Sequence, residues 1–312
     1  MTQTLQHSIN FAKPFIQYSP LTAGFGQEPA VSIASMVRNS ILNPPLTWFF
    51  NRKEVTFPTV VGQQDYVLST VPDLAFAEKI SLADDEGNIF EIKDIQNNAA
   101  LAVSSFQQRP NAASVQASSI ISNVLNYTVR FLGVPEKIYT ATLTYQKLSP
   151  QFGPFFITSS SNASGGNTTY TGSFDTISFP VGATAIVTGF VTNAVNNGSF
   201  TVVSVTNTSL VLANAAGVAE TASAFVSNFS WDPIPSQYSD VYNNLFLSEA
   251  LAMVDDSRAQ LYRQRGVAAF LAKATGLSEM QKNVFVQQWI ARANERQGDA
   301  GIITTGNTSR GI

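Results

Sequence analysis

Hydrophobic and polar residues alternate along much of residues 53–145, and this two-residue period predicts β-strands. The clearest alternation covers residues 126–133 and 137–148, on either side of a turn that contains a proline. We therefore expect these two segments to pair as a β-hairpin. A second hairpin is expected around the turn at residues 85–88. Residues 99–123, rich in Ala, Ser and Gln, have no clear pattern.

Apolar residues spaced three and four apart predict a short helix over residues 29–42. Pro29 suits the first turn of a helix, where its missing N–H costs nothing. Asn43 ends the helix, because a residue that precedes a proline avoids the α conformation.

The same spacing predicts a run of helices over residues 236–296. Ser236 is a candidate N-cap and Gly276 a candidate C-cap. Ser278 and Gln281 fit a capping box that opens the last helix. One face of that helix carries residues four apart, namely Phe285, Trp289 and Ala293.

Both ends of the chain are expected to lack regular structure. Residues 1–28 contain several Pro and Gly residues and predict an irregular apolar arm, which lies either on a neighbouring subunit or on its own domain. Residues 297–312 are expected to form a tail, not a helix of their own.

Residues 151–230 interrupt the normal composition of the chain, because their only charged side chains are Asp175 and Glu220. The segment begins with a polar tract at residues 159–170, which we expect to be flexible. Short β runs follow, and they predict a small barrel or sandwich. These runs are residues 174–179, 185–191, 199–205 and 209–214.

Low charge is the main feature of the whole composition. Charged residues make up 12% of the chain, the net charge is −3, and cysteine is absent. These values exclude disulfides and a global attraction to nucleic acid or anionic membranes. A surface poor in charge suits a subunit of an assembly, and we prefer this interpretation to a soluble protein whose surface is built from uncharged polar residues. Without a signal peptide or an apolar run of about 20 residues, we expect a soluble protein of cytoplasmic origin.

The chain has little of the chemistry that enzymes need. Its single histidine, His7, lies in the predicted arm, and no phosphate-binding or Cys/His metal motif occurs. The acidic residues 84–86 invite a calcium site but lack the ligand spacing of an EF-hand, so a solvated turn is preferred. Asp255 and Asp256 are adjacent, so on a helix they point in different directions. We expect no enzyme activity, no cofactor and no metal.

Basic residues gather in the helical region, where they form one candidate contact surface. Arg258 and Arg265 are seven apart and share a helix face. Such a surface suits phosphate or an acidic partner subunit, whereas a solvated face balanced by acidic neighbours is the simpler interpretation. The other basic residues of this region are Arg263, Lys273 and Lys282, and the acidic neighbours are Glu249, Asp255 and Asp256.

Two segments, residues 127–148 and 234–265, resemble the β-hairpin and the following helix of head-to-tail connectors of tailed phages. The hairpin has a proline in its turn and ends in Tyr-x-Lys at Tyr145–Lys147. The helix opens with Pro-x-x-Tyr at Pro235–Tyr238. Residues 47–70, with TWFFNR and EVTFPTVVGQQDYVLST, also resemble these adaptor proteins, which are of the tail tubular protein A type.

The resemblance implies a split domain, because in many relatives the Tyr-x-Lys strand runs almost directly into the Pro-x-x-Tyr helix. We expect an α+β adaptor domain built from residues 29–150 and 231–297, a helical bundle with an antiparallel β domain. Residues 151–230 would be an inserted all-β domain, and residues 298–312 a C-terminal tail. Within the insert, residues 189–212 resemble small β modules of phage tail proteins.

The resemblance also implies a structural role in the virion. A ring, normally a homo-dodecamer, would link the portal protein to the tail nozzle, and double-stranded DNA would pass through its lumen without specific binding. The ring would contact no membrane and would assemble in the cytoplasm of the bacterial host. We expect portal or subunit contacts at Arg258, Arg263, Arg265, Trp289, Ile302, Ile303 and Arg310.

An alternative places the protein on the exposed part of a tail. The β domain at residues 151–230 would then contact a receptor, a carbohydrate or another tail component. A third hypothesis is a cell-wall hydrolase, and its only support is the presence of carboxylates to which no role is assigned.

Overall fold

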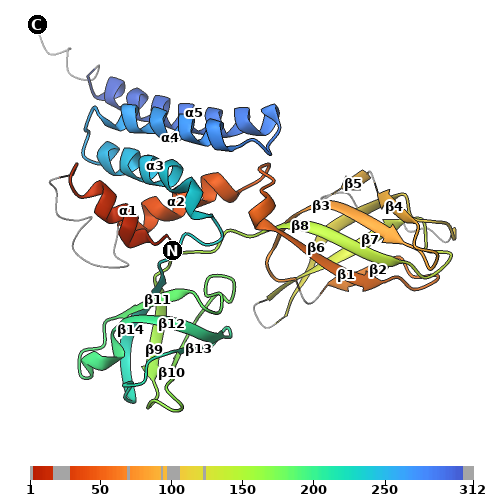
Figure 1. The fold of residues 1–312 in the computed structure, drawn as a ribbon, viewed down its shortest axis with the longest axis horizontal. Helices are drawn as coiled ribbons and strands as arrows, with labels where there is room; N and C mark the ends of the chain where they lie inside the picture. The colour runs from red at the N-terminus through yellow and green to blue at the C-terminus, as the bar shows by residue number, and fades with distance from the viewer. Residues whose placement is uncertain are drawn as a thin grey trace, which may run out of the picture. The chain divides into compact units, whose positions relative to one another are not determined.

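The protein is represented by a computed structural model that describes residues 3–16, 29–68, 71–92, 94–96, 106–121 and 124–304. Its contacts divide the chain into two compact units, residues 1–41 with 150–312, and residues 42–149. The domain boundaries expected from the sequence stay a prediction. The fold class is confirmed, because helices, mainly antiparallel sheets and a closed barrel occur in one chain (Figure 1).

The unit at residues 42–149 contains two four-stranded sheets, with strand orders β1-β8-β3-β4 and β2-β7-β6-β5. All neighbours are antiparallel except β5 and β6. A short 3-10 helix, η2 (Phe49–Asn51), precedes the first strand. The strands are β1 (Arg52–Pro58), β2 (Asp65–Leu68), β3 (Leu74–Ala83), β4 (Ile89–Ile92), β5 (Asp94–Gln96), β6 (Ala112–Ile121), β7 (Val124–Leu132) and β8 (Thr140–Lys147).

The two sheets share one hydrophobic core. Phe57 of the first sheet packs against Tyr66 and Phe131 of the second, with ring centroids 5.5 and 6.4 Å apart. Ile80 and Leu143, from the first sheet, are also fully buried in this core. The unit is therefore a β-sandwich, stabilised by apolar side chains that alternate inward along each strand.

The predicted hairpin over residues 126–133 and 137–148 is wrong, although both strands exist. β7 pairs with β2 and β6, whereas β8 pairs with β1 and β3 in the other sheet. Alternation shows which face of a strand is buried, but two strands that face each other across a core alternate in the same way as two that pair. The hairpin around residues 85–88 is confirmed by the pairing of β3 with β4.

Residues 99–123 contain a strand that the sequence did not reveal. β6 (Ala112–Ile121) forms ladders with both β5 and β7, and the rest of this region includes residues outside the description. Its Ala- and Ser-rich sequence has weak strand propensity, so long-range pairing decides its conformation.

The prediction of a small barrel or sandwich within residues 151–230 is confirmed, and the domain is a closed barrel. Its strands close in the order β10-β13-β12-β11-β14-β9 around a core that includes Ile157, Tyr170, Val187 and Leu210. A 3-10 helix, η3 (Ala194–Asn196), lies between two of them. The strands are β9 (Phe155–Ser160), β10 (Thr168–Gly172), β11 (Thr184–Thr188), β12 (Gly198–Val205), β13 (Ser209–Leu212) and β14 (Glu220–Asn228).

Two details of the barrel differ from the prediction. Residues 159–170 include the end of β9 and the start of β10, which pair, so this stretch is largely a hairpin. Residues 174–179 are a turn instead of a strand, because the Asp175 carboxylate accepts hydrogen bonds from the Ile177 N–H and the Ser178 hydroxyl. Such a side-chain bond fixes a turn in preference to a ladder.

The helices are α1 (Leu5–Ala12), α2 (Ala30–Leu42), η4 (Ser236–Tyr238, a 3-10 helix), α3 (Ser239–Ala252), α4 (Ala259–Lys273) and α5 (Glu279–Thr304). In Figure 1, α3, α4 and α5 run side by side, and α1 packs against α3. The helix predicted at residues 29–42 is confirmed. So is the capping box, since Ser278 N donates to Gln281 Oε1 and Gln281 N donates to Ser278 Oγ.

Several helix boundaries differ from the prediction. Part of the predicted arm at residues 1–28 is helix α1, whose Leu5 and Ile9 are buried. Ser236 begins the short helix η4 and does not cap α3, and α4 ends before Ala274, not at Gly276. Helix α5 continues to Thr304, into the predicted tail, because extending an existing helix costs much less than starting one.

One buried arginine joins the two places where the chain enters and leaves the barrel. The guanidinium of Arg38, on α2, donates to the carbonyl oxygens of Pro150 and Ser230. It also lies 3.3 Å above the centre of the Phe152 ring. Burial lowers the pKa of Arg38 well below its ordinary value, while the charge of Asp232 acts in the opposite direction. We call Arg38, Phe152, Trp231 and these two carbonyls the Arg38 junction.

Trp231 extends the Arg38 junction to helices α1 and α3. Its indole ring stacks on Tyr242 of α3 with centroids 4.4 Å apart. Its Nε1 donates to Ser8 Oγ of α1 at 3.0 Å, and Ser8 Oγ donates to Asn243 Oδ1 at 2.7 Å. The backbone adds to this, since Trp231 N donates to Gln3 O at 3.1 Å. Helices α1, α2 and α3 therefore meet around Trp231, which lies between the last barrel strand and η4.

Replacing Arg38 by Met should lower the free energy of unfolding by about 3 kcal/mol, because two buried carbonyls lose their donor. Urea unfolding followed by circular dichroism measures this change. Arg265→Met is the matched control, since Arg265 is exposed, and it should change stability by less than about 0.5 kcal/mol. Equal midpoints for the Arg38 variant and the wild type would contradict the role given to this junction.

Candidate functional site

Helix α4 has two different faces. The buried face carries Tyr262, Gly266 and Phe270, and it packs on α3. Gly266 is required for this packing, because a Cβ at that position would lie 2.6 Å from Leu245 Cδ2 and 3.2 Å from Leu245 N. The two helices therefore approach closely, and the opposite face of α4 points to solvent.

The solvent side of α4 carries two exposed leucines beside exposed polar residues such as Gln260 and Gln264. Leu261 and Leu271 are 46% and 42% exposed, and Arg265 and Ala268 are exposed between them. These four residues are spaced by four, three and three, so they line one side of the helix. The Arg265 guanidinium lies 5.2 Å from the centre of the Tyr262 ring. We call these four residues the α4 outer stripe.

Arg258 also reaches the surface, but it is engaged at the start of α4. Its guanidinium forms an ion pair with Asp256 at 2.7 Å and donates to Phe15 O at 2.9 Å. Hydrogen bonding to Asp256 raises the pKa of Arg258 and lowers that of Asp256. Arg258 and Asp256 also border a pocket of about 320 Å³. Its other lining residues include Phe15, Ile16, Leu251 and Val254.

The remaining predicted contact residues do not join Arg258 and Arg265 on the surface. Arg263 is buried and pairs with Glu249 of α3 at 3.1 Å. Trp289 is buried beside Phe285, whose ring stacks on Phe270 of α4 with centroids 3.6 Å apart. The helical period of α4 could have shown that Arg263 is buried, because Arg263 lies between Tyr262 and Gly266 on the buried side of the helix.

The other basic and C-terminal residues fall in three groups. Lys273 pairs with Asp240 of α3, and Lys282 pairs with Glu279 at 2.7 Å. Ile302 and Ile303 lie at the end of α5, where the backbone alone is described. Arg310 lies outside the described residues.

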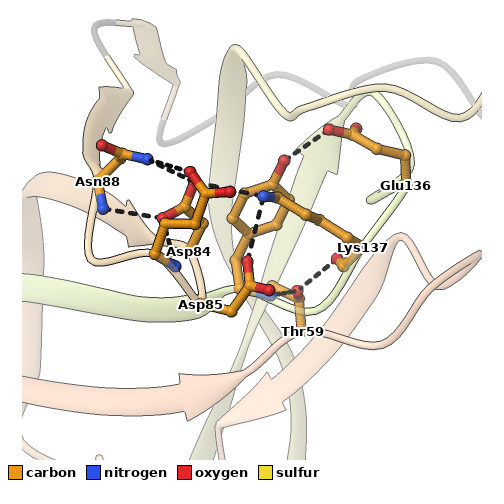
Figure 2. A network of polar contacts seen from close by, with 8 residues as sticks. Thr59, Asp84, Asp85, Asn88, Glu136 and Lys137 are labelled. Carbon is orange, nitrogen blue, oxygen red and sulfur yellow. Dashed lines mark hydrogen bonds and ion pairs between the residues drawn. The ribbon is translucent and has the colours of Figure 1, made fainter.

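The acidic turn after β3 is an ion-paired network (Figure 2). Asp84 Oδ1 accepts hydrogen bonds from the backbone N–H groups of Glu86 and Asn88. The Lys137 ammonium lies 3.3 Å from both Asp84 Oδ2 and Asp85 Oδ1, so a lysine offsets part of the negative charge of the turn. Within the described ranges no group of three or more His, Cys, Asp or Glu side chains is placed to hold a metal ion.

The network also joins the turn to the connection between β7 and β8. Tyr139 Oη donates to Glu136 Oε1 at 2.6 Å, and Tyr139 N donates to Thr59 Oγ1 at 2.7 Å. Burial and the Glu136 carboxylate raise the pKa of Tyr139 to about 12. These bonds connect the loops at one end of the sandwich.

No helix among the residues that the structure describes is long and apolar enough to cross a membrane. Neither the protein-family models nor the curated proteins contain a match to this chain.

The carboxyl group of Asp84 makes the stability of the sandwich depend on pH. Burial alone would raise the pKa of Asp84, but hydrogen bonds from Asn88 and Lys137 lower it below its ordinary value of 3.8. The resulting stability is present above pH 3.8 and is lost as the pH falls through the lower pKa of the folded state.

Asp84→Asn should therefore be less stable than the wild type at neutral pH, and its melting temperature should fall less between about pH 5 and about pH 2. Thermal unfolding across this range measures both effects. Asp85→Asn is the control, because the Asp85 side chain is 81% exposed and its loss should matter little. If the melting temperatures of Asp84→Asn and the wild type fell equally with pH, Asp84 would not be the source of this pH dependence.

Proposed function

We propose that this protein is a structural subunit of a tailed-phage head-to-tail connector, an adaptor ring between the portal and the tail. The sequence resemblance of residues 127–148 and 234–265 to such connectors motivates the proposal. The main structural observation behind it is the α4 outer stripe. A helix that turns leucines to solvent on one side and buries aromatic residues on the other has two apolar faces, as a subunit of an assembly does.

Neighbouring helices add further exposed apolar side chains. Met280 and Ile290 of α5 are 71% and 47% exposed, and Met253 and Val254 follow the end of α3. Methionine adapts its shape to irregular partner surfaces, so it is frequent where proteins bind each other. The three helices together therefore support a contact with the portal or with a second subunit.

Helix α5 supports a contact beyond the chain's own core. Its first half packs on α4 through Phe285, yet the helix has 26 residues and is about 39 Å long. In an adaptor, the far half of such a helix and the residues after it reach the portal. Arg265, which is exposed on α4, supplies charge-assisted hydrogen bonds to acidic groups of the partner. Arg258 is also exposed but keeps its own ion pair with Asp256.

The first test is on the α4 outer stripe. The double variant Leu261→Asp and Leu271→Asp should fold normally, since both side chains are exposed, but lose co-purification with the portal protein of the same genome by at least about tenfold. The matched control is Val67→Asp and Ile89→Asp, which changes two exposed apolar residues of the sandwich (64% and 74% exposed). Equal portal recovery for both double variants would argue against a helical docking surface.

The second test is on the C-terminus. Deleting residues 298–312 should abolish docking to the portal, whereas the untruncated chain alone should stay monomeric or weakly associated and form rings when the portal is present. Light scattering after size-exclusion chromatography separates these states. Deleting residues 305–312 alone tells whether the contact lies in the end of α5 or beyond it. Normal docking by the chain that lacks residues 298–312 would rule out the C-terminal contact.

A further inference from the structure

Two aromatic side chains lie exposed side by side on the outside of the barrel. Phe156 of β9 and Phe225 of β14 are direct partners across the antiparallel ladder. They are 45% and 43% exposed, and their ring centroids are 5.9 Å apart with the planes at 70°. Exposed aromatic pairs are costly in water, so this pair needs an explanation.

The strand alternation shows that the two rings do not belong to the barrel core. Ile157, Ala224 and Val226, next to the two rings in sequence, are fully buried inside the barrel, and Phe155 is partly buried against the same core. The outward positions next to the rings carry small hydroxyl side chains. Thr188 of β11 pairs directly with Phe225, and Thr158 and Ser223 follow at the next outward positions of β9 and β14. We call Phe156, Thr158, Thr188, Ser223 and Phe225 the barrel face.

Charge limits what the barrel face can bind. Residues 151–230 contain no Lys or Arg, so a phosphate-rich ligand such as a nucleic acid meets no counter-charge within the barrel. Both acidic residues are engaged internally. Glu220 accepts hydrogen bonds from the N–H groups of Thr192 and Asn193, and Asp175 fixes its own turn. A ligand matched to this surface is therefore neutral.

The closed barrel limits the mode of binding as well. Every barrel strand has a hydrogen-bonded neighbour on both sides, so no strand edge accepts an added peptide strand. Recognition must use side chains on the outer face. Aromatic rings with hydroxyl groups around them suit a sugar, whose C–H face packs on a ring while its hydroxyls bond to Ser and Thr. Contacts between proteins, by comparison, are depleted in Ser.

We infer that the barrel face binds a neutral carbohydrate. Phe225 lies at its centre, between Phe156 and Thr188, and supplies the main stacking surface, while the flanking hydroxyls select the orientation of the sugar ring. This inference goes beyond the connector function and does not rest on it, because the barrel face includes no residue of the helices.

Calorimetric titration of the full chain with cellohexaose, chitohexaose and maltohexaose tests the inference. At least one of these neutral sugars should bind with a dissociation constant of about 1 mM or tighter. Phe225→Ala and Phe156→Ala should each weaken that binding by about tenfold, since each removes an aromatic contact. Both residues are half-exposed, so the variants should fold, and Ser223→Ala supplies a milder change on the same face.

Val181→Ala is the control, because Val181 is a 73% exposed apolar residue that precedes the start of β11, whereas Thr188 ends that strand, and the variant should bind like the wild type. Binding by none of the three sugars would overturn the inference, as would binding that survives both Phe variants. Self-association of the chain that Phe225→Ala abolishes would assign the face to a protein contact instead, and would also overturn it.

Discussion

The two hydrogen bonds from Arg38 to the carbonyls of Pro150 and Ser230 are the contacts on which the unit of residues 1–41 and 150–312 depends. A buried guanidinium is expensive, and it is tolerated here because carbonyl dipoles and the Phe152 ring surround it. The bonds hold together two backbone positions 80 residues apart, so the barrel begins and ends at one point. Trp231 then connects that point to α1 and α3.

This arrangement gives the compositional break in the sequence a physical meaning. The two ends of the barrel are held by Arg38, which belongs to α2 and not to the barrel. The barrel therefore needs no charged side chains of its own to attach to the helices. The helices keep their own apolar contacts, among them the close approach of α3 and α4 at Gly266. The proposed assembly through the α4 outer stripe and the proposed sugar binding through the barrel face would use different surfaces of one chain.

Local chemistry was predictable from the sequence, whereas long-range pairing was not. The capping box of Ser278 and Gln281 was found because both partners lie within one turn. The buried faces of β7 and β8 were found as well, but their sheet partners were not, since alternation carries no information about the strand alongside. Nothing in the sequence indicated that Arg38 is buried. An arginine in an amphipathic helix is usually solvated, and the carbonyls that bury this one are more than 100 residues away.

Amide hydrogen exchange of Arg38→Met tests the central role of this arginine most directly. The amide of Asn228, which donates to Phe152 O, lies next to the junction, whereas that of Val202 lies within the barrel. We expect protection to fall at residues 151–153 and 228–231 while the barrel strands β11 and β12 keep theirs. Unchanged protection at both ends of the barrel would contradict the account.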